Sequence, residues 1–543
     1  MAKFSQLLYN QCLLAYSPFQ TLRKRTNLSN KMVDSLWFSS LALIIFITVI
    51  HKLFISNEQK YHNLPPSPPS LPIIGHLHLL KQPVHRTLQS LSETYGKVLL
   101  LRWGSRKVLL LTSPSAAEEC FTKNDIIFTN RPRMLAGKVL HYDYTTVTFA
   151  PHGDLWRNLR RVMTLELFSS SRLAAFQSVR EEEVRVVLDQ IMRRSVNNNG
   201  MRKVDLKTKF LELSFNAMTM TMVGRRFYGE DVEDQAEAKN VREVIKVAVE
   251  LSATTNLGDF FQFMQWMDVT GLEKKIVGFS RRMDTFLQGL LDERRKVMAV
   301  DCSDRKDKVR SKLMIDNLLS LQESEEKYYT DDIIKGIVGV LLVAGTETAS
   351  TTMEWAMALL LNHPDKMNKV RTEIDAKVGE HRLMNEQDLP KLNYLQNVIT
   401  EALRVYPPVP LLVPREASED CVVGGFDVPR GTMLMINAWA IHRDPEFWED
   451  PTEFKPERFE GWSGEGGEAY KIVPFGAGRR GCPGDVLAKR FIALAIGTLV
   501  QSFEWERISE EKVDMSEGLG ISMPRIHPLD AFCKPRPVIE ASM

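Results

Sequence analysis

The stretch VPFGAGRRGCPGDVLAK, residues 473–489, decides the fold because it fits two different kinds of site. Gly476, Gly478 and Gly481 match the G-x-G-x-x-G pattern of a dinucleotide-binding loop, with an apolar run before them and a helical pattern after them. Cys482, which follows two arginines and precedes a proline, has no part in that pattern. The loop therefore predicts either a pyrophosphate site or a site built around a sulfur atom.

The dinucleotide interpretation fails on the residues around the loop. Its ribose-binding acid would be Glu504, about 20 residues further on. Only 543 − 504 = 39 residues follow Glu504, too few for the rest of a dinucleotide-binding sheet. Pro474 also lies in the expected first strand, where proline removes a ladder hydrogen bond. The sulfur atom of Cys482 becomes the better candidate.

The composition narrows the function classes. The net charge is +2 with 25% charged residues, so nothing global indicates nucleic acid binding. The cysteines form no C-x-x-C pair and there is no H-E-x-x-H, which argues against a zinc site or a disulfide scaffold. The six cysteines are Cys12, Cys120, Cys302, Cys421, Cys482 and Cys533. The bulk of the chain is therefore expected in a reducing compartment.

Residues 34–55 are predicted to form a single membrane anchor. LWFSSLALIIFITVI, residues 36–50, carries no charge, and apolar residues resume after His51 and Lys52. This length corresponds to about one crossing of a bilayer. A buried core helix or a cleaved signal sequence is the alternative, although no clear small-residue cleavage site is present.

Residues 1–31 form an N-terminal extension with five Lys and Arg and no acidic residue. We expect Met32 to be the functional start, and an organelle transit peptide is the competing interpretation. With a start at Met32, Lys52 and Lys60 place the C-terminal bulk in the cytosol by the positive-inside rule. If residues 1–31 are present, their positive charges predict by the same rule that the N-terminus lies in the cytosol.

Residues 62–75 are predicted to be a stiff hinge, because five prolines lie between Pro65 and Pro72. A catalytic domain, 76–543, follows. KVLLLRWGSRKVLLLTS, residues 97–113, reads as two strands around a turn. Most of the chain to residue 400 has helical periodicity, so the domain is expected to be mainly α with a smaller β portion.

The longest helix is predicted from Thr330, a suitable N-cap followed by two aspartates, to Asn362, before His363 and Pro364. Its apolar surface implies burial in protein or lipid, but Lys335 and Glu347 make a second membrane span unfavourable. Residues 345–348, GTET, place a glycine, two β-branched hydroxyls and a carboxylate in the middle of this apolar helix. All four are unfavourable there, which is typical of a functional site or of a satisfied polar kink.

Beyond this helix, Glu401 and Arg404 lie one helical turn apart, and Arg458 follows in a proline-marked loop. Such a pair is ordinarily a surface ion pair, and each of these features alone is weak.

Five motifs in this order resemble the cytochrome P450 haem-thiolate monooxygenases, and the resemblance runs from the anchor to the end of the chain. They are WRNLRR (156–161), AGTETAS (344–350), EALR (401–404), PERF (456–459) and FGAGRRGCPG (475–484). The resemblance implies the cytochrome P450 fold and a haem b cofactor. It makes Cys482 the axial thiolate ligand of the iron. Cleavage of dioxygen requires an electron-rich ligand, and a thiolate is such a ligand.

The resemblance also implies roles for further residues. Glu347 and Thr348 are expected to be the catalytic acid and alcohol that relay protons to dioxygen, although Ala349 stands where the family often has Thr or Ser. Glu401, Arg404 and Arg458 would form a buried structural triad. The remaining cofactor-binding residues would be Phe475, Gly478, Arg480, Gly484, Trp156, Arg160 and Arg415.

No nicotinamide or flavin motif is present, so electrons are expected from NADPH through the membrane-bound cytochrome P450 reductase. The implied location is the endoplasmic reticulum membrane, single-pass, with the catalytic domain cytosolic. Segments such as LPPSPPSLPIIGHLHLL (64–80) and NRPRMLAGK (130–138) are similar to plant members of the isoflavone 2'-hydroxylase and 3'-hydroxylase group.

The substrate is expected to be a small apolar plant specialised metabolite, such as an isoflavonoid or phenolic, oxidised with O2. The predicted pocket segments are 131–150, 340–344, 409–413 and 518–526, with Leu411, Leu412, Ile521 and Met523 prominent. Alternatives are a terpenoid or xenobiotic substrate, or a haem-thiolate isomerase or haem-binding protein that does not activate O2.

Overall fold

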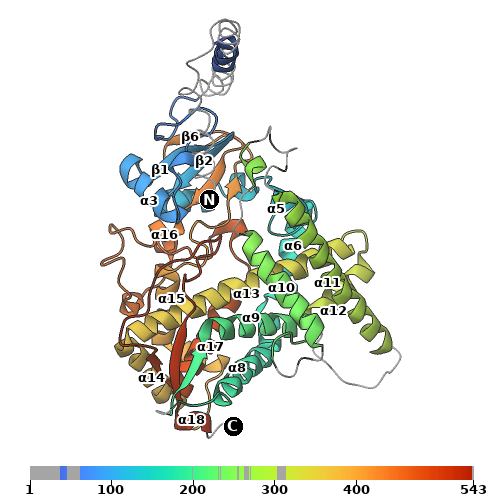
Figure 1. The fold of residues 1–543 in the computed structure, drawn as a ribbon, viewed down its shortest axis with the longest axis vertical. Coiled ribbons are helices and arrows are strands. Elements are labelled where there is room, and N and C mark those ends of the chain that lie inside the picture. The colour runs from blue at the N-terminus through green and yellow to red at the C-terminus, as the bar shows by residue number, and fades with distance from the viewer. Residues whose placement is uncertain are drawn as a thin grey trace, which may run out of the picture.

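The computed structural model describes residues 37–45, 61–197, 200–229, 232, 234–252, 256–261, 264, 268, 271–301 and 313–540. Residues 37–45 are helical, whereas the rest of the predicted anchor (34–55) and the whole extension 1–31 lie outside the described residues. The predicted hinge, 62–75, is irregular backbone in which Gly75 forms isolated bridges to Leu71 and to Trp103. It leads into a mainly helical body with small sheets at its edges (Figure 1).

The largest sheet has four strands in the order β1-β2-β7-β4. The predicted hairpin is confirmed, because β1 and β2 are antiparallel and joined by a tight turn; β2 then pairs in parallel with β7. A three-stranded sheet, β3-β9-β8, and the β5-β6 hairpin complete the β portion. The strands are β1 (Val98–Trp103), β2 (Arg106–Leu111), β3 (Arg202–Asp205), β4 (Arg415–Glu416), β5 (Cys421–Val423), β6 (Phe426–Val428), β7 (Met433–Ile436), β8 (Phe503–Arg507) and β9 (Asp530–Pro535).

Helices make up most of the body. Those that frame the site are α6 (Asp154–Val162), α9 (Leu206–Val223), α11 (Leu272–Asp301), α13 (Asp331–Asn362), α15 (Asn393–Val405) and α17 (Asp485–Ser502). The others are α3 (Val84–Tyr95), α4 (Pro114–Phe121), α5 (Leu135–Val139), α7 (Ser170–Ala175), α8 (Gln177–Met192), α10 (Gln235–Ser252), α12 (Met314–Ser324), α14 (Pro364–Val378), α16 (Ala438–Ile441) and α18 (Pro537–Glu540).

Helix α13 runs through the centre of the body, as Figure 1 shows. The Thr330 side chain accepts a hydrogen bond from the Ile333 N–H at 3.4 Å, which confirms the predicted N-cap. The helix is long and apolar enough to cross a membrane, but 61% of its most apolar window is buried inside the protein. Its apolar surface is therefore used for packing against helices such as α9 and α17.

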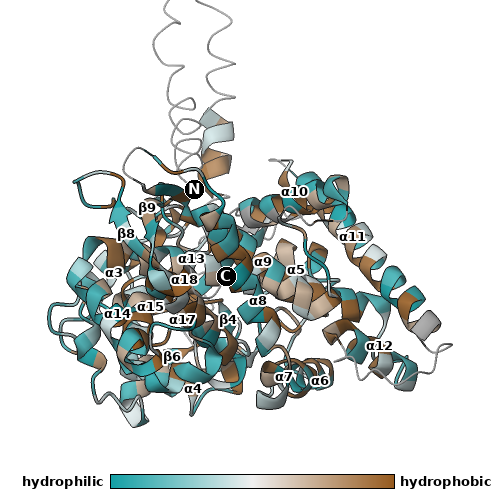
Figure 2. Cartoon of the chain, turned by 90° about the horizontal axis from the view of Figure 1, so that it is seen from below, coloured by the Kyte–Doolittle hydropathy of each residue, from teal (hydrophilic) through white to brown (hydrophobic). Residues whose placement is uncertain are grey.

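Hydropathy follows this arrangement. The outer helix α14 is largely hydrophilic in Figure 2, and only Met367, Val370 and Ile374 of its residues are buried. Helix α17, which packs against both α13 and α14, is buried continuously from Phe491 to Ser502. The start of α17, which carries the cysteine loop, is thus fixed to the core of the domain.

Candidate active site

The cysteine loop is folded back on itself ahead of α17. The Cys482 N–H donates to the Phe475 carbonyl at 2.9 Å, and Gly484 is the N-cap of α17. Gly478 has a φ of +67°, and a Cβ at this position would lie 2.4 Å from Oδ1 of Asp125. Position 478 therefore requires glycine for both its backbone angle and its close contact.

Asp125 holds the loop from outside. Its carboxylate accepts the Arg479 N–H at 3.2 and 3.1 Å, and its Oδ1 lies 3.5 Å from Nη1 of Arg415. Asp125 lies four residues beyond the end of α4 and is 9% exposed. No sequence signal identified this residue, because its partner Arg479 is 354 positions away.

Cys482 lies on the wall of an internal cavity at the N-terminus of α17. Its surface is accessible from the cavity, yet the surrounding protein desolvates the thiol and raises its pKa. The Gly484 N–H, Arg160 and Lys489 oppose this shift because they favour the anion. Burial is the largest effect, so the loop alone does not make Cys482 a strong acid.

One cavity contains most of the predicted site. The cavity has a volume of about 320 Å³, and Cys482 and Thr348 both line it. All the predicted cofactor-binding residues line it except Gly478. Its apolar wall includes Val340, Leu341, Ala344, Val409, Leu412 and Val413.

Three predicted pocket residues, Leu411, Ile521 and Met523, lie elsewhere. Ile521 is exposed, and Met523 is buried, with its backbone hydrogen-bonded to Pro408 and Trp355. None of Leu411, Ile521 and Met523 is among the described residues that line the cavity. The segment 518–526 packs against α13 instead, because the backbone of Met523 is hydrogen-bonded to Pro408 and to the Trp355 side chain of α13.

Six arginines line the cavity: Arg131, Arg160, Arg172, Arg180, Arg415 and Arg480. Arg172 pairs with Glu166 and Arg180 pairs with Glu386, so the other four carry most of the uncompensated positive charge of the wall. Arg480 stacks over Trp156, 4.4 Å from the ring centroid, and donates to the carbonyls of Thr129, Val147 and Ala150. Burial, together with the positive charge of Arg415, lowers the pKa of Arg480 to about 9, and burial lowers that of Arg415 to about 10.

Three of these four arginines, Arg131, Arg160 and Arg480, lack an acidic partner within the described residues. Arg131 donates to the carbonyls of Thr148, Val413 and Pro414. Within the described ranges, no carboxylate pairs with Arg131, Arg160 or Arg480, and Asp125 is the one that pairs with Arg415. Buried charges ordinarily have counter-ions. A ligand with two carboxylates, such as haem, therefore fits this wall, as it fits the single thiol beside it.

The predicted triad comes together behind the cysteine loop. Glu401 and Arg404 are fully buried, and the Glu401 carboxylate accepts from Arg404 Nε at 2.6 Å and Nη2 at 2.8 Å. Arg458 Nε donates to the same carboxylate at 2.9 Å. Arg404 also donates to the backbone carbonyls of His442, Pro451 and Glu453. The three residues thus join α15 to the chain segment 442–458.

His442 connects this cluster to the cysteine loop. The Val473 N–H donates to Nε2 of His442 at 2.8 Å, so Nδ1 carries the proton that is donated to the Arg404 carbonyl at 3.1 Å. Burial, together with the nearby positive charges of Arg404 and Arg443, lowers the pKa of His442 to about 3. A neutral imidazole therefore bridges the two motifs.

The predicted acid and alcohol point in different directions. Thr348 lines the cavity, and its hydroxyl donates to the Ala344 carbonyl at 2.7 Å. Glu347 turns away, and its carboxylate accepts a hydrogen bond from the Ser522 hydroxyl. Ser350, which stands one position beyond Ala349, donates to the Glu347 carbonyl at 3.0 Å rather than to the cavity.

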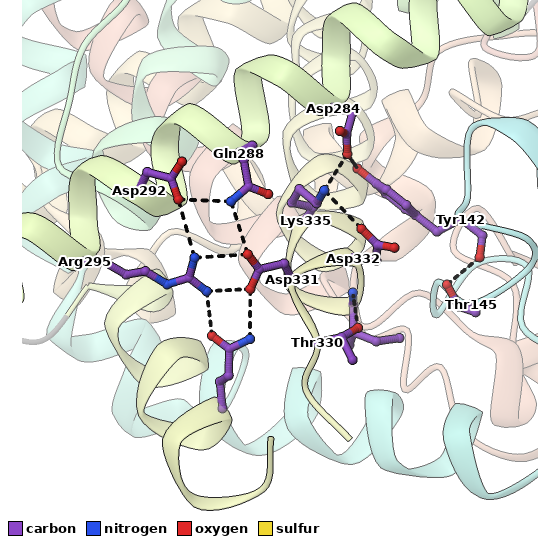
Figure 3. A network of polar contacts seen from close by, with 12 residues as sticks. Tyr142, Thr145, Asp284, Gln288, Asp292, Arg295, Thr330, Asp331, Asp332 and Lys335 are labelled. Atoms are coloured by element: carbon purple, nitrogen blue, oxygen red, sulfur yellow. Dashed lines mark hydrogen bonds and ion pairs between the residues drawn. The ribbon is translucent and has the colours of Figure 1, made fainter. Parts of the chain in front are cut away.

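The segment 131–150 contributes Arg131, Val147 and Thr148 to the cavity wall, and its middle is held by a polar network (Figure 3). Tyr142 donates to Asp284 of α11 at 2.9 Å, and Lys335 of α13 bonds to the same carboxylate at 2.6 Å and to Asp332 at 3.0 Å. Three consecutive residues, 142–144, have φ between +48° and +63°. This left-handed run is unfavourable for residues with side chains, so the network must hold it.

We expect Tyr142→Phe to loosen this segment locally. The change removes a hydrogen bond to a charged group, which contributes about 1.5–3 kcal/mol. Hydrogen exchange of the amides in 138–146 should accelerate, while amides in α17 keep their protection. Tyr95→Phe, in the partly exposed last turn of α3, is the control and should leave exchange in 138–146 unchanged. Unchanged exchange in Tyr142→Phe would show that the network does not restrain the segment.

The fold, the cysteine loop and the buried cluster define a haem-thiolate protein, and the comparisons agree. Residues 65–528 match the family model for cytochrome P450, so the chain belongs to the cytochrome P450 family. The predicted fold is confirmed by a zebrafish cytochrome P450 solved with progesterone, with a TM-score of 0.71 and 26% identity over 84% of this chain and 100% of that one. The chain is a haem-thiolate monooxygenase.

Plant enzymes are among the similar proteins. Cytochrome P450 81Q32 of Catharanthus roseus is 50% identical over 93% of this chain and 98% of that protein. The (+)-piperitol/(+)-sesamin synthase CYP81Q2 of Sesamum radiatum is 46% identical over 94% and 98%. An isoflavone 3'-hydroxylase of Medicago truncatula is 46% identical over 93% and 99%. The predicted resemblance to this plant group is confirmed.

Proposed function

We propose that this protein uses NADPH and O2 to hydroxylate or otherwise oxidise an apolar phenolic metabolite, such as an isoflavonoid or a lignan. The observation that carries the proposal is the single cavity that Cys482, Thr348 and apolar side chains line together. Pockets of this character favour neutral, largely apolar ligands. The named activities of the isoflavone hydroxylase and the sesamin synthase support the choice of a phenolic substrate.

In this proposal Cys482 would ligate the iron of haem b, and the loop from Phe475 to Gly484 would support it. Arg160, Arg415 and Arg480, with Trp156, would hold the carboxylates of the haem. When bound, haem supplies an iron centre that activates dioxygen and transfers one oxygen atom to the substrate. The apolar wall orients the substrate and excludes bulk water from its reacting carbon.

Glu347 and Thr348 handle protons in the proposed reaction. Thr348 presents its hydroxyl to the cavity, where it can donate a hydrogen bond once it releases the Ala344 carbonyl. Burial raises the pKa of Glu347, so this carboxyl carries a proton over a wider pH range than an exposed one. The two groups are suited to pass protons into a cavity that is otherwise apolar.

The proposal includes the membrane and the electron donor. Residues 34–55 would anchor the protein in the endoplasmic reticulum with the catalytic domain in the cytosol. Arg479, Lys489 and Arg490 are exposed beside the cysteine loop and would meet an acidic surface of the NADPH-cytochrome P450 reductase. The buried core triad Glu401, Arg404 and Arg458 would be structural.

The proposed function is tested with membranes that contain the protein. Product should form from isoflavonoid or lignan substrates only when NADPH, O2 and the reductase are all present. A panel of terpenoids and xenobiotics serves as the comparison. Turnover of those compounds with none of the phenolics would contradict the substrate class, and turnover without NADPH would contradict the electron source.

Thr348→Ala should uncouple the reaction. A positioned proton donor contributes on the order of 10²–10⁴-fold, so product per NADPH consumed should fall about tenfold or more while NADPH oxidation continues. Thr352→Ala is the matched control, because Thr352 lies one turn further along α13 and its hydroxyl donates to the helix backbone at 2.8 Å. Equal coupling in the two variants would contradict the role of Thr348.

A further inference from the structure

The turn 517–525 brings a single hydroxyl to the middle of α13. Glu517 and Arg525 form an antiparallel bridge, and the Gly518 N–H donates to the Pro524 carbonyl at 2.7 Å. Ser522, near the tip of this turn, is 8% exposed and donates its hydroxyl hydrogen bond to Glu347. The turn was predicted to line the substrate pocket, but its buried polar atom is directed at the carboxylate behind the pocket.

The position of Ser522 is fixed by its neighbour. The Met523 N–H donates to the Pro408 carbonyl at 2.9 Å, and the Met523 carbonyl accepts from Nε1 of Trp355 at 2.8 Å. Trp355 is fully buried and stacks on Tyr406 at 3.8 Å between ring centroids. The backbone next to Ser522 is therefore clamped between α13 and the end of α15, which leaves the hydroxyl little freedom to move from Glu347.

The other groups around Glu347 are few. Lys207, at the start of α9, is the cation whose charge lowers the pKa of Glu347. Burial has the opposite effect, because it disfavours the ionised carboxylate of Glu347. Glu354 lies two turns further along α13, where it accepts the Leu529 N–H at 3.0 Å and faces Arg525 at 3.8 Å. Asp205, the N-cap of α9, adds negative charge near Glu354. Lys207 acts on both carboxylates, so the polar surface of Glu347 faces α9 and the C-terminal turn.

We propose that Ser522 is a positioning residue for proton delivery, which holds the Glu347 carboxylate toward the C-terminal turn and re-supplies it with protons from that side. The proposal rests on the proposed function, in which Glu347 and Thr348 serve the cavity. Glu347 gives its proton toward Thr348 and becomes a carboxylate. The Ser522 hydroxyl then passes its own proton to that carboxylate while its oxygen takes one from a hydronium ion of the solvent, which leaves water, so Ser522 is unchanged after each transfer.

A hydroxyl in this position sets the pH dependence of the relay. The hydrogen bond from Ser522 favours the ionised carboxylate and is the largest of the effects that oppose desolvation. Its removal should therefore move the titration of Glu347 to higher pH. It should also slow reprotonation, because the carboxylate loses its donor on the side away from the cavity.

The variants are Ser522→Ala, Ser522→Thr, which keeps a hydroxyl, and Ser516→Ala as the matched control. Ser516 belongs to the same C-terminal segment, but it is exposed and its hydroxyl donates to Asp514 at 2.7 Å. The carboxyl band of Glu347 is followed by infrared spectroscopy of the haem-loaded protein across pH and is assigned with Glu347→Gln. This readout needs no turnover.

Ser522→Ala should raise the midpoint of the Glu347 band, and Ser522→Thr and Ser516→Ala should keep it near the wild-type value. Product per NADPH should fall about tenfold in Ser522→Ala, and its alkaline limb should move in the same direction as the band. An unchanged midpoint, or a changed midpoint with unchanged coupling, would overturn the proposal.

The proposed function can fail separately. If Thr348→Ala leaves coupling intact, the acid and alcohol do not serve the cavity, whatever the infrared result. If Thr348→Ala uncouples the enzyme while Ser522→Ala behaves as wild type in both measurements, the relay stands and its proton supply does not pass Ser522. Thermal unfolding of each variant, compared with the wild type, separates these outcomes from a folding defect.

Discussion

Cys482→Ser should abolish turnover and remove the red-shifted absorption band of the CO complex of the reduced protein. The band depends on thiolate ligation, and a serine hydroxyl is neither as acidic nor as electron-rich as a cysteine thiol. The variant should still fold, because the Cys482 side chain faces the cavity rather than the core. Circular dichroism checks the fold, and the spectrum after reduction with CO checks the ligand.

Cys421→Ser is the control for this experiment. Cys421 is half-buried in β5 and does not line the cavity. It should keep both the red-shifted band and turnover. If Cys482→Ser retained the band, another residue would be the ligand and the assignment of the loop would be wrong.

Arg404→Lys should be the most destabilising conservative change in the buried cluster. The guanidinium makes two bonds to Glu401 and three to backbone carbonyls, and an ammonium cannot reproduce this fork. Lysine keeps the charge but leaves buried acceptors without a donor, and each such acceptor costs about 1–3 kcal/mol. The variant should give little haem-loaded protein and a clearly lower urea midpoint.

The matched control is Arg382→Lys. Arg382 also makes a two-bond contact with a carboxylate, to Asp388 at 2.7 and 2.8 Å, but 48% of its side chain is exposed. A pair of this kind contributes about 0–1 kcal/mol, so the urea midpoint should change little. Equal losses in the two variants would show that burial does not set the strength of the Glu401 cluster.

The parts of the fold that the sequence predicted are those with local signals. Helix α13 has an N-cap, acidic residues in its first turn and a His-Pro stop, and it lies within one residue of the predicted range. The β1-β2 hairpin follows from two apolar runs around a Gly-Ser turn. The cysteine loop carries enough glycine, arginine and proline at fixed spacing to be identified without its surroundings.

The parts that the sequence did not predict depend on contacts between distant segments. Asp125 and His442 organise the cysteine loop, but each is an ordinary residue in its own segment. Arg131 was included only as the end of a pocket segment, and its place beside Arg480 comes from the packing of the cavity wall. The turn 517–525 was misplaced because its apolar residues suggested a pocket, whereas backbone bonds to Pro408 and Trp355 decide its position.

The arginines of the cavity wall also bear on how the protein matures. Before haem is loaded, Arg131, Arg415 and Arg480 repel one another in a poorly solvated space, and Asp125 balances only part of that charge. Haem that binds the folded chain adds the missing negative charge and stabilises that state by mass action. The amount of enzyme in a cell would then follow the supply of haem, because unloaded chains unfold more often and are degraded.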